Sequence, residues 1–541
     1  MIEKIMKAVK RGNKRRGRNI TIGAVIGFLL SCTVVTGADD NYLWIKEDSG
    51  AIKFSTNSTT GDNGDWKTEN PYENAGNIWD KDTEPKTYTN NMLLSSNAAN
   101  GNDSGYISYG LRLSGELTNV NFVNNNSITG EISDTGYGFG IYNTDKMGNI
   151  ANTGLISGTG SSSSSSSEGH GIVNNLGIMG AITNIGIISG TGKSDGSGDG
   201  TGSGIINISN VKKMGNIINE MGNIKNTGVI SGTGNGAGSG AGTGYGIYNS
   251  STSTMGKITN TGIISGIGSS SGSYGFGYGI NNTGTIGEIT NTGIISGTST
   301  SGTGICNSGT MENITNRGLI SGYDTGSGIY NDSSEIKNIT NAGLISGIDN
   351  STGDGSGIYN YKSEMENITN AGLISSTGNS TSDAGTGSGI NNDSDDKEMG
   401  AITNTGIISG YGTGSSSVSE GYGIYNKSGT IGEITNAGLI NGYAASTSAA
   451  FAYGIFNDTN AIKIGNIANT GVISGYGNGL DSGSTGSSST ALGFGIYNTD
   501  TMESITNAGI ISGIGTGAGI YNKSGTMGAI TNTGIIYGTS N

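Results

Sequence analysis

From about residue 140 onward, isoleucine and asparagine recur in short segments that glycine separates. One segment reads Gly-Ile-x-Asn, as at residues 328–331, and the next reads Ile-Thr-Asn-Thr-Gly-Ile-Ile-Ser-Gly, as at residues 289–297. The segments lack the 3.6-residue period of a helix, and each is too short to be a stable hairpin by itself. The pattern therefore predicts short β-strands joined by turns.

The two segments alternate strictly, and each occurs thirteen times. Equivalent positions lie 25 to 42 residues apart, and the extra length falls largely in Gly/Ser-rich stretches such as residues 159–168. One unit holds three β-type segments (Gly-Ile-Tyr-Asn, Met-Gly-x-Ile-Thr-Asn and Gly-Ile-Ile-Ser) and can bury its Ile side chains only against neighbouring units. The repeats predict an all-β fold, a parallel β-helix (β-solenoid) of about 13 coils with an irregular N-terminal cap.

The repeated Asn and Gly residues have expected roles at the corners of the coils. Each Asn that ends one of the first two segments would recur at one corner, where its amide can bond the coils above and below and tolerate a left-handed turn. Gly at segment entry and in Asn-Thr-Gly or Asn-Ala-Gly is expected to supply the positive φ of a corner. The remaining glycines are expected in flexible Gly/Ser loops.

Composition excludes several classes of protein. The 541 residues include 103 Gly but only 2 Pro, 2 Cys and 1 His. Collagen needs Pro and a Gly at every third position, and a disulfide scaffold needs more Cys. Both Pro and all three Trp precede residue 90, and the absence of Pro beyond that point is what a long hydrogen-bonded stack requires.

These features divide the chain into four ranges. We expect an extended signal peptide over 1–38, an N-terminal cap region over 39–105, one or more degenerate first coils over 106–139, and the repeat β-helix over 140–541. The degenerate coil is indicated by Leu117-Thr118-Asn119 and Ser127-Ile128-Thr129-Gly130.

The N-terminal range has the features of a secretory signal. Residues 1–38 carry eight basic residues and one acidic residue, and all nine precede an apolar run from Ile20 to Val35. This run is short for a transmembrane helix, and the small residues after it favour cleavage after Ala38. Leu29-Leu30-Ser31-Cys32 is an alternative processing site, at which Cys32 would be lipidated. Residues 39–541 hold 19 basic and 40 acidic residues, so nucleic acid is not an expected partner.

Catalytic motifs are sparse. Gly169-His170-Gly171 and Asn143-Thr144-Asp145 are similar to two of the four short motifs of polygalacturonases, which cleave polysaccharides with paired carboxylates. However, residues 146–168 contain no Asp for the third motif, and the basic fourth motif is missing after His170. Asp481-Ser482-Gly483-Ser484 matches part of a serine-protease motif without a protease-like domain around it. We therefore expect no catalytic residues, with a polysaccharide-cleaving β-helix enzyme (polygalacturonase- or lyase-like) as the alternative.

Metal and cofactor sites are not expected. Residues 195–200 begin like an EF-hand loop, but the twelfth position is Ile206 instead of the bidentate Glu. One His and isolated Cys residues cannot supply a zinc ligand set.

An aromatic residue fills the third position of Gly-Ile-x-Asn in eight units. Because neighbours of an inward Ile point outward in a strand, these rings should form a ladder on one outer face. The ladder can stabilise the coils by stacking, or it can serve as a binding surface for glycans or proteins. The eight residues are Tyr142, Tyr248, Tyr330, Tyr359, Tyr425, Phe456, Tyr497 and Tyr521. Cys306 occupies the same position and is interpreted as a substitution, not as a nucleophile.

The N-terminal segment resembles a known class of secreted protein. Residues 14–23 (KRRGRNITIG) and Leu43-Trp44-Ile45 are similar to the extended signal and following segment of fusobacterial-type autotransporters, and the Gly/Asn-rich repeats resemble autotransporter passengers. The resemblance implies type V secretion and display on the outer-membrane surface of a Gram-negative bacterium. It also implies a role in adhesion, aggregation or biofilm formation.

The resemblance sets the expected function and partners. We expect a non-catalytic adhesin or structural stalk whose partners are host or bacterial surface proteins or glycans, together with the secretion machinery. The sequence departs from the family at its end, where residues 530–538 are still a repeat and not a translocator barrel. We therefore expect a truncated passenger, or one that relies on a separate translocator.

Overall fold

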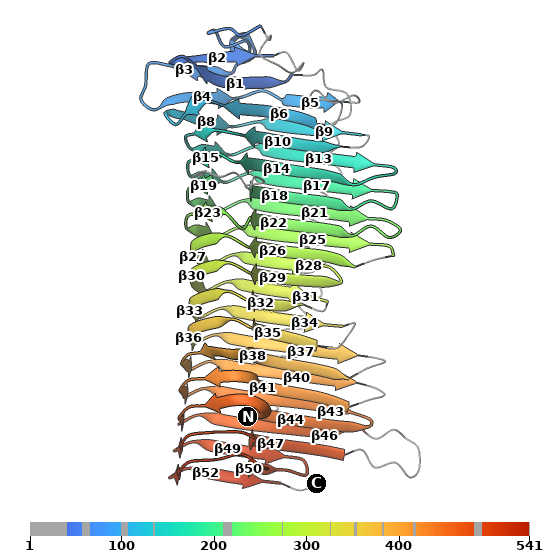
Figure 1. Cartoon of the computed structure of the whole chain (residues 1–541), viewed down its shortest axis with the longest axis vertical. Coiled ribbons are helices and arrows are strands. Elements are labelled where there is room, and N and C mark those ends of the chain that lie inside the picture. The colour runs from blue at the N-terminus through green and yellow to red at the C-terminus, as the bar shows by residue number, and fades with distance from the viewer. Residues whose placement is uncertain are drawn as a thin grey trace. The chain divides into compact units, whose positions relative to one another are not determined.

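The computed structural model describes residues 41–539, apart from 57–64, 99–106, 134–135, 209–218, 273, 325, 351–353, 381–383, 415–417 and 481–489. The predicted signal, with Cys32 and Ala38, lies outside the described residues. The described chain is built almost entirely of β-strands that stack in parallel, coil upon coil (Figure 1). This architecture confirms the predicted parallel β-helix.

Each coil contributes a first strand, which carries the Gly-Ile-x-Asn segment in the thirteen repeats and Gly110-Leu111-Arg112-Leu113 in the coil before them. These strands pair in parallel with the first strands of the coils before and after them. They are β6 (Ile107–Ser114), β10 (Tyr137–Asn143), β14 (Ser167–Asn175), β18 (Gly200–Ile208), β22 (Gly242–Asn249), β26 (Gly275–Asn282), β29 (Ser301–Asn307), β32 (Ser327–Asp332), β35 (Asp354–Tyr361), β38 (Gly385–Met399), β41 (Val418–Ile431), β44 (Ala449–Ile464), β47 (Thr490–Asn498) and β50 (Ala518–Asn522).

One or two short second strands follow, and they carry the Met or Ile position and the Ile-Thr-Asn segment. They belong to the same 37-stranded sheet as the first strands. They are β7 (Glu116–Leu117), β8 (Val120–Asn124), β11 (Lys146–Met147), β12 (Ile150–Asn152), β15 (Ile178–Met179), β16 (Ile182–Asn184), β19 (Asn219–Met221), β20 (Ile224–Asn226), β23 (Ser253–Met255), β24 (Ile258–Asn260), β27 (Thr285–Asn291), β30 (Thr310–Asn316), β33 (Glu335–Asn341), β36 (Glu364–Asn370), β39 (Ile402–Asn404), β42 (Ile434–Asn436), β45 (Ile467–Asn469), β48 (Ile505–Asn507) and β51 (Ile530–Asn532).

The third strands form a separate 15-stranded parallel sheet, one strand per coil. Thirteen of these strands belong to the thirteen repeats, and β5 and β9 add two coils before them. They are β5 (Leu94–Ala98), β9 (Ser127–Ile132), β13 (Leu155–Ser162), β17 (Ile187–Ser194), β21 (Val229–Gly236), β25 (Ile263–Ser270), β28 (Ile294–Thr298), β31 (Leu319–Tyr323), β34 (Leu344–Asp349), β37 (Leu373–Ser380), β40 (Ile407–Gly414), β43 (Leu439–Ser446), β46 (Val472–Gly479), β49 (Ile510–Ile514) and β52 (Ile535–Gly538).

Four apolar rows fill the interior of the stack. In one coil they are represented by Ile329, Ile336, Ile339 and Ile345, all of which are fully buried. Register pairing repeats each position in the next coil, so that Ile329 lies over Ile358. Burying an Ile side chain contributes about 1.5–3 kcal/mol, and stacking lets every coil use the apolar side chains of its two neighbours.

Two ladders of buried Asn residues run beside the apolar rows, as the sequence predicts. In one ladder each side-chain amide donates to the side-chain oxygen of the next, from Asn143 to Asn522, over 2.7–3.0 Å. In the other the bonds run from Asn90 to Asn532 over 2.7–2.9 Å. The bonds satisfy amides that would otherwise be buried without partners.

Two expectations about the corners are wrong: the repeated glycines do not supply positive φ, and the corner Asn residues are not left-handed. Among the described residues, positive φ occurs at six Gly and six other positions, and none of these lies in a Gly-Ile-x-Asn or Asn-Thr-Gly segment or is an Asn. The glycines are needed instead because backbones approach closely. A Cβ on Gly293, in a corner, would lie 2.1 Å from the carbonyl oxygen of Gly262 in the coil before it.

The same close approach creates a flat arm on each coil. Beyond the apolar core, the third strand and the next first strand face each other with glycine between them, as Gly297 on β28 and Gly302 on β29 do. Many glycines assigned to loops by the sequence therefore lie inside strands. Figure 1 shows the longer arms as strands that project to one side, for example β13, β17 and β21.

The N-terminal region protects the first strand edges. β1 (Leu43–Asp48) pairs in parallel with β6, and β2 (Ala51–Ser55) covers it in antiparallel pairing. In the same way, β3 (Ile78–Asp80) covers β4 (Lys86–Asn90), which pairs in parallel with β8. Parallel pairing with the stack thus begins at Leu43 in β1 and continues at Lys86 in β4, both within the range assigned to the cap by sequence. The antiparallel strands block two edges that could otherwise pair with another chain. A short 3₁₀ helix, η1 (Glu73–Ala75), completes this region.

The coil before the repeats is more complete than its sequence indicates. β6 to β9 supply all three strand positions, and Ile128 lies in register with Ile156. Its corner residue in the Asn ladder is Asn124, not Asn119, because Phe122-Val123-Asn124 is in register with Ile150-Ala151-Asn152.

Candidate functional site

The eight predicted ladder residues occupy one register row on the outer side of the first strands. Tyr521 is 42% exposed, and the other seven are half-buried. Non-aromatic residues interrupt the row in three places. Val173 and Ile206 separate Tyr142 from Tyr248. Asn281 and Cys306 separate Tyr248 from Tyr330, and Asn391 separates Tyr359 from Tyr425. Direct ring contacts within the row therefore join only Tyr330 to Tyr359, and Tyr425 through Phe456 and Tyr497 to Tyr521.

A second aromatic row, which the sequence reasoning missed, lies beside the first. It occupies the residue before the Gly of Gly-Ile-x-Asn, a position at which the motif Tyr/Phe-Gly-Ile is visible in the sequence. Its members are Tyr109, Phe139, Tyr245, Tyr278, Tyr422, Tyr453 and Phe494. The two rows meet across the chain bend at this Gly, as in the stacked pair Tyr422–Tyr425, whose ring centroids lie 4.4 Å apart.

Ring geometry favours a stabilising role for these rows. Tyr422 stacks on Tyr453 at 5.1 Å with planes 9° apart, and Tyr425 stacks on Phe456 at 5.3 Å with planes 9° apart. Stacked rings turn their faces toward one another along the coil axis, and Tyr422 is only 2% exposed. The faces with which a tyrosine would stack on a sugar ring are therefore already occupied in this part of the row.

Carboxylates pair with the phenol groups along the same face. The Tyr422 hydroxyl donates to Glu420 and the Tyr425 hydroxyl donates to Asp458, both over 2.7 Å. Asp393 accepts hydrogen bonds from Tyr359, Lys427 and Ser428. These contacts satisfy the phenols of Tyr359, Tyr422 and Tyr425.

This packing shifts the pKa values of tyrosines and carboxylates on the aromatic face. Burial raises the pKa of Tyr422 well above its usual value, and the neighbouring Glu420 raises it further. Burial also raises the pKa of Glu420. For Asp393 burial acts in the same direction, but the hydrogen bonds from Lys427 and Ser428 outweigh it and lower the pKa. The face thus presents neutral phenols at neutral pH.

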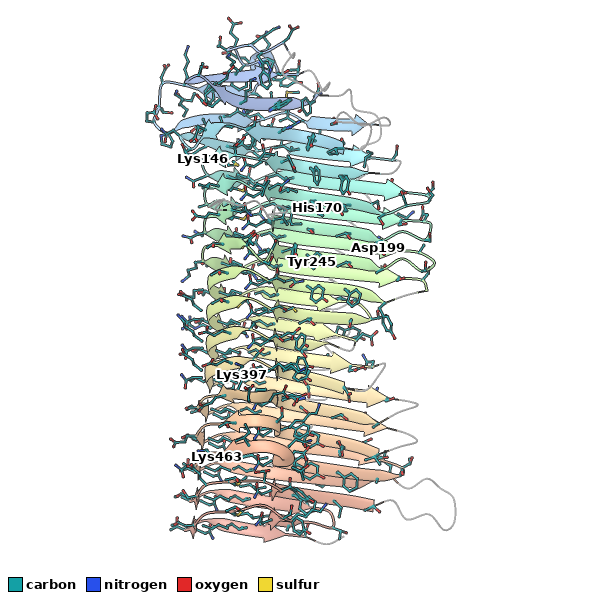
Figure 2. All side chains as sticks on the ribbon, viewed as in Figure 1. Lys146, His170, Asp199, Tyr245, Lys397 and Lys463 are labelled. Atoms are coloured by element: carbon teal, nitrogen blue, oxygen red, sulfur yellow. The ribbon has the colours of Figure 1, made fainter. Side chains whose placement is uncertain are left out.

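His170 takes the place of an aromatic ring in the second row (Figure 2). Its imidazole stacks on Phe139 at 5.6 Å and is in register with Phe139 and Ser203. Nε2 lies 3.0 Å from a carboxylate oxygen of Glu168, whereas Nδ1 has no partner and the residue is 2% exposed. Ser203 lies in the next coil, where its hydroxyl is fully buried and has no hydrogen-bond partner. The three side chains are of the types found in a hydrolase triad, but a substrate cannot reach the buried Ser203.

The other candidate residues have structural surroundings. Asn143 lies in the Asn ladder, and Asp145 accepts a hydrogen bond from the backbone amide of Gly115. Asp199 accepts one from the backbone of Ala241 in the next loop. Cys306 is 8% exposed, and burial raises the pKa of its thiol to about 12, which disfavours the nucleophilic thiolate. The Asp481-Ser482-Gly483-Ser484 motif lies outside the described residues.

Within the described ranges, no group of three or more His, Cys, Asp or Glu side chains is arranged to hold a metal ion. A polar depression lies over successive corners of the stack, lined by hydroxyls and by Glu335, Glu364, Lys362 and Lys397, and its charges of both signs balance. In the part of the chain that the structure describes, no helix is long and apolar enough to cross a membrane.

Comparison with models of protein families, with curated proteins and with solved structures gave no match for this chain.

Proposed function

We propose that the protein is a non-catalytic β-helix passenger, exported through its N-terminal signal and displayed on the surface of a Gram-negative bacterium as an adhesin or structural stalk. The observation that carries this proposal is the continuity of the two Asn ladders and the Ile rows through the described coils. Repeat proteins of this kind build length and surface by adding identical units.

The use of polar side chains supports the same function. The buried Asn amides bond to other coils, and the phenols of Tyr359, Tyr422 and Tyr425 bond to carboxylates. Cross-coil ion pairs such as Lys146–Glu116 and Lys463–Glu503 join neighbouring units on the surface. These interactions hold coils together, and a stalk needs that continuity along its length.

Surface labelling tests display. An epitope tag inserted after Gly238, in an exposed arm loop, should bind antibody on intact cells that express the full chain. The control chain lacking residues 1–38 should be labelled only after the cells are made permeable. Labelling of the full chain only in permeable cells would contradict display. The mass of the mature N-terminus distinguishes cleavage before Asp39 from lipidation at Cys32.

Adhesion needs a separate measurement. Cells that display the chain should bind more strongly than control cells to surfaces coated with host surface proteins or glycans, and antibody against the arm tag should reduce that binding. If display is observed and binding is unchanged, the stalk function remains and the adhesin function fails.

The alternative is a polysaccharide-cleaving enzyme, and the Glu168–His170 contact is the observation that favours it. Purified protein should then release reducing ends from pectin-type or host glycans, and His170→Ala should abolish the release. For a stalk we expect no release from either protein.

A further inference from the structure

The outer face of the third-strand sheet is flat and uniform. Every second residue of the strands from β13 to β52 points outward, which creates one row of Leu, Ile or Val, one row of Ser that Asn441 and Tyr537 interrupt, and one row of Thr, Ile or Tyr. In β28, for example, these are Ile294, Ser296 and Thr298. Parallel pairing places each row member over its equivalent, such as Ser296 over Ser321. Among the described residues, the extensive contacts of the third strands are with one another and with the facing first strands, and no other element packs extensively on the outer side.

This face lacks charge over a long stretch. In the eleven consecutive strands from β21 to β52 the only Asp, Glu, Lys, Arg or His is Asp349, which points inward and is fully buried. Charged outward residues, Glu131 and Lys193, occur only in strands before β21. Others, such as Arg317 and Asp324 around β31, flank the face at its borders.

The remaining faces carry the charge of an acidic protein. Residues 39–541 have 40 acidic and 19 basic side chains. Carboxylates line the aromatic face, and charged pairs such as Lys257–Glu288 line the second strands. In Figure 2, Lys146, Lys397 and Lys463 lie toward the edge of the stack away from the arms, and Asp199 lies at an arm tip. Two copies therefore repel each other least when they meet through the third-strand sheets.

The area of this face is sufficient for a stable contact. Eleven strands spaced at about 4.8 Å, each 4 to 8 residues long, cover on the order of 1,000 Å². Stable interfaces bury about 800 Å² per partner. The aliphatic row supplies apolar area, with Ile294 38% exposed, and the Ser and Thr hydroxyls can donate and accept across the contact.

We propose that this charge-free face is a self-association surface, on which the third-strand sheets of two copies of the chain pack together with two-fold symmetry. The proposal is independent of where the protein is displayed. A flat face with the same residues in each row complements itself when the two-fold axis runs across the coil axis, because each row then meets residues of its own kind.

Sedimentation analysis of residues 41–541, which form one compact unit, tests the proposal. We expect a monomer–dimer equilibrium with a Kd on the order of micromolar. Raising the salt concentration should strengthen the dimer, since it screens the repulsion between two acidic chains. A chain that stays monomeric at about 100-fold higher concentration than this Kd, with and without added salt, would overturn the proposal.

Charge placed on the face should prevent association. In the variant Ser265→Asp, Ser321→Asp, Ser409→Asp, three half-buried outward positions of β25, β31 and β40 gain a carboxylate, and Kd should rise at least about tenfold. The matched control Thr340→Asp, Thr369→Asp, Thr435→Asp adds the same charge at exposed positions of β33, β36 and β42 and should leave Kd nearly unchanged. Circular dichroism checks that both variants fold. Equal effects of the two folded variants would mean that the dimer uses another face and would reject the assignment.

Discussion

Gly297 on the third strand β28 faces Thr303 on the first strand β29 of the next coil, so close that a Cβ on Gly297 would stand 2.1 Å from the Thr303 carbonyl oxygen. The same substituent would stand 2.2 Å from the carbonyl oxygen of Gly277, on the first strand β26 of its own coil. Backbone thus packs directly on backbone between the two sheets of each arm. This packing explains why an elongated β-protein contains so much glycine within its strands.

The first prediction compares two glycines. Gly297→Ala should destabilise the protein by about 3 kcal/mol or more, because the backbones must separate to admit a methyl group. The control Gly287→Ala has nothing closer than 3.7 Å to its new Cβ and should be neutral or stabilise by about 0.5–1 kcal/mol, since it restricts the unfolded chain. Urea denaturation measures both. Equal stability of the two variants would contradict the close packing of the arms.

The second prediction concerns the Asn ladder. Asn341 accepts from Asn316 and donates to Asn370, each over 2.8 Å, and is fully buried. Asn341→Ala leaves the buried side-chain oxygen of Asn370 without its donor, at a cost of about 1–3 kcal/mol. The amide of Asn316 keeps its bonds to the carbonyl oxygens of Gly318 and Leu344. The exposed Asn367, which donates to Asn338 over 3.1 Å, is the control, and Asn367→Ala should change the free energy of unfolding by about 0.5 kcal/mol or less.

The third prediction removes a whole coil. Residues 294–318 separate two register-equivalent positions, Ile294 and Leu319. Their deletion should leave β-structure and a cooperative thermal transition in circular dichroism, because neighbouring coils can stack on one another directly. Deleting only 294–305 shifts the Ile and Asn rows out of register, and the cooperative transition should then be lost or move to a much lower temperature. Similar transitions for the two deletions would argue against a register-dependent stack.

The fourth prediction is loss of stability at alkaline pH. Burial raises the pKa of Tyr411 to about 12, and Tyr443, whose ring stacks on it at 4.6 Å, adds to the shift. Burial also raises the pKa of Tyr453 above its ordinary value of 10.0. Because unfolded tyrosines ionise first, the contribution of these rings to stability is complete below pH 10 and is lost as the pH rises toward 12 and beyond.

Tyrosine ionisation can be followed by the absorbance of phenolate. In the folded protein a large fraction should ionise only above pH 10, together with unfolding. Tyr453→Phe should reduce the dependence of the melting temperature on pH in this range. If all tyrosines ionise near pH 10 while the protein remains folded, the rings are more accessible than the structure indicates.

Sequence regularity allowed the fold and part of the outer surface to be predicted. The repeated Ile identified the core, and the repeated Asn identified residues that bond between coils. The row of Tyr142 and its equivalents was found in the same way, because the residue after an inward Ile must point outward. The second row was missed because the bend at the intervening Gly brings Tyr422 beside Tyr425, and strict strand alternation does not place residues three apart on one side.

The sequence alone determined that the chain is a stack of β-coils with Ile rows and Asn ladders, because a strict repeat forces each residue to meet its own kind. Only the tertiary structure decided the role of glycine and the start of the stack. Close backbone contact between Gly297 and Thr303 depends on how two sheets approach each other, which no local pattern encodes. The pairing of β4 with β8 likewise joins segments that keep the ladder Asn of the repeat (Asn90 and Asn124) but carry Tyr88 and Phe122 in place of its Ile. The hydrogen bonds between their backbones do not require that Ile.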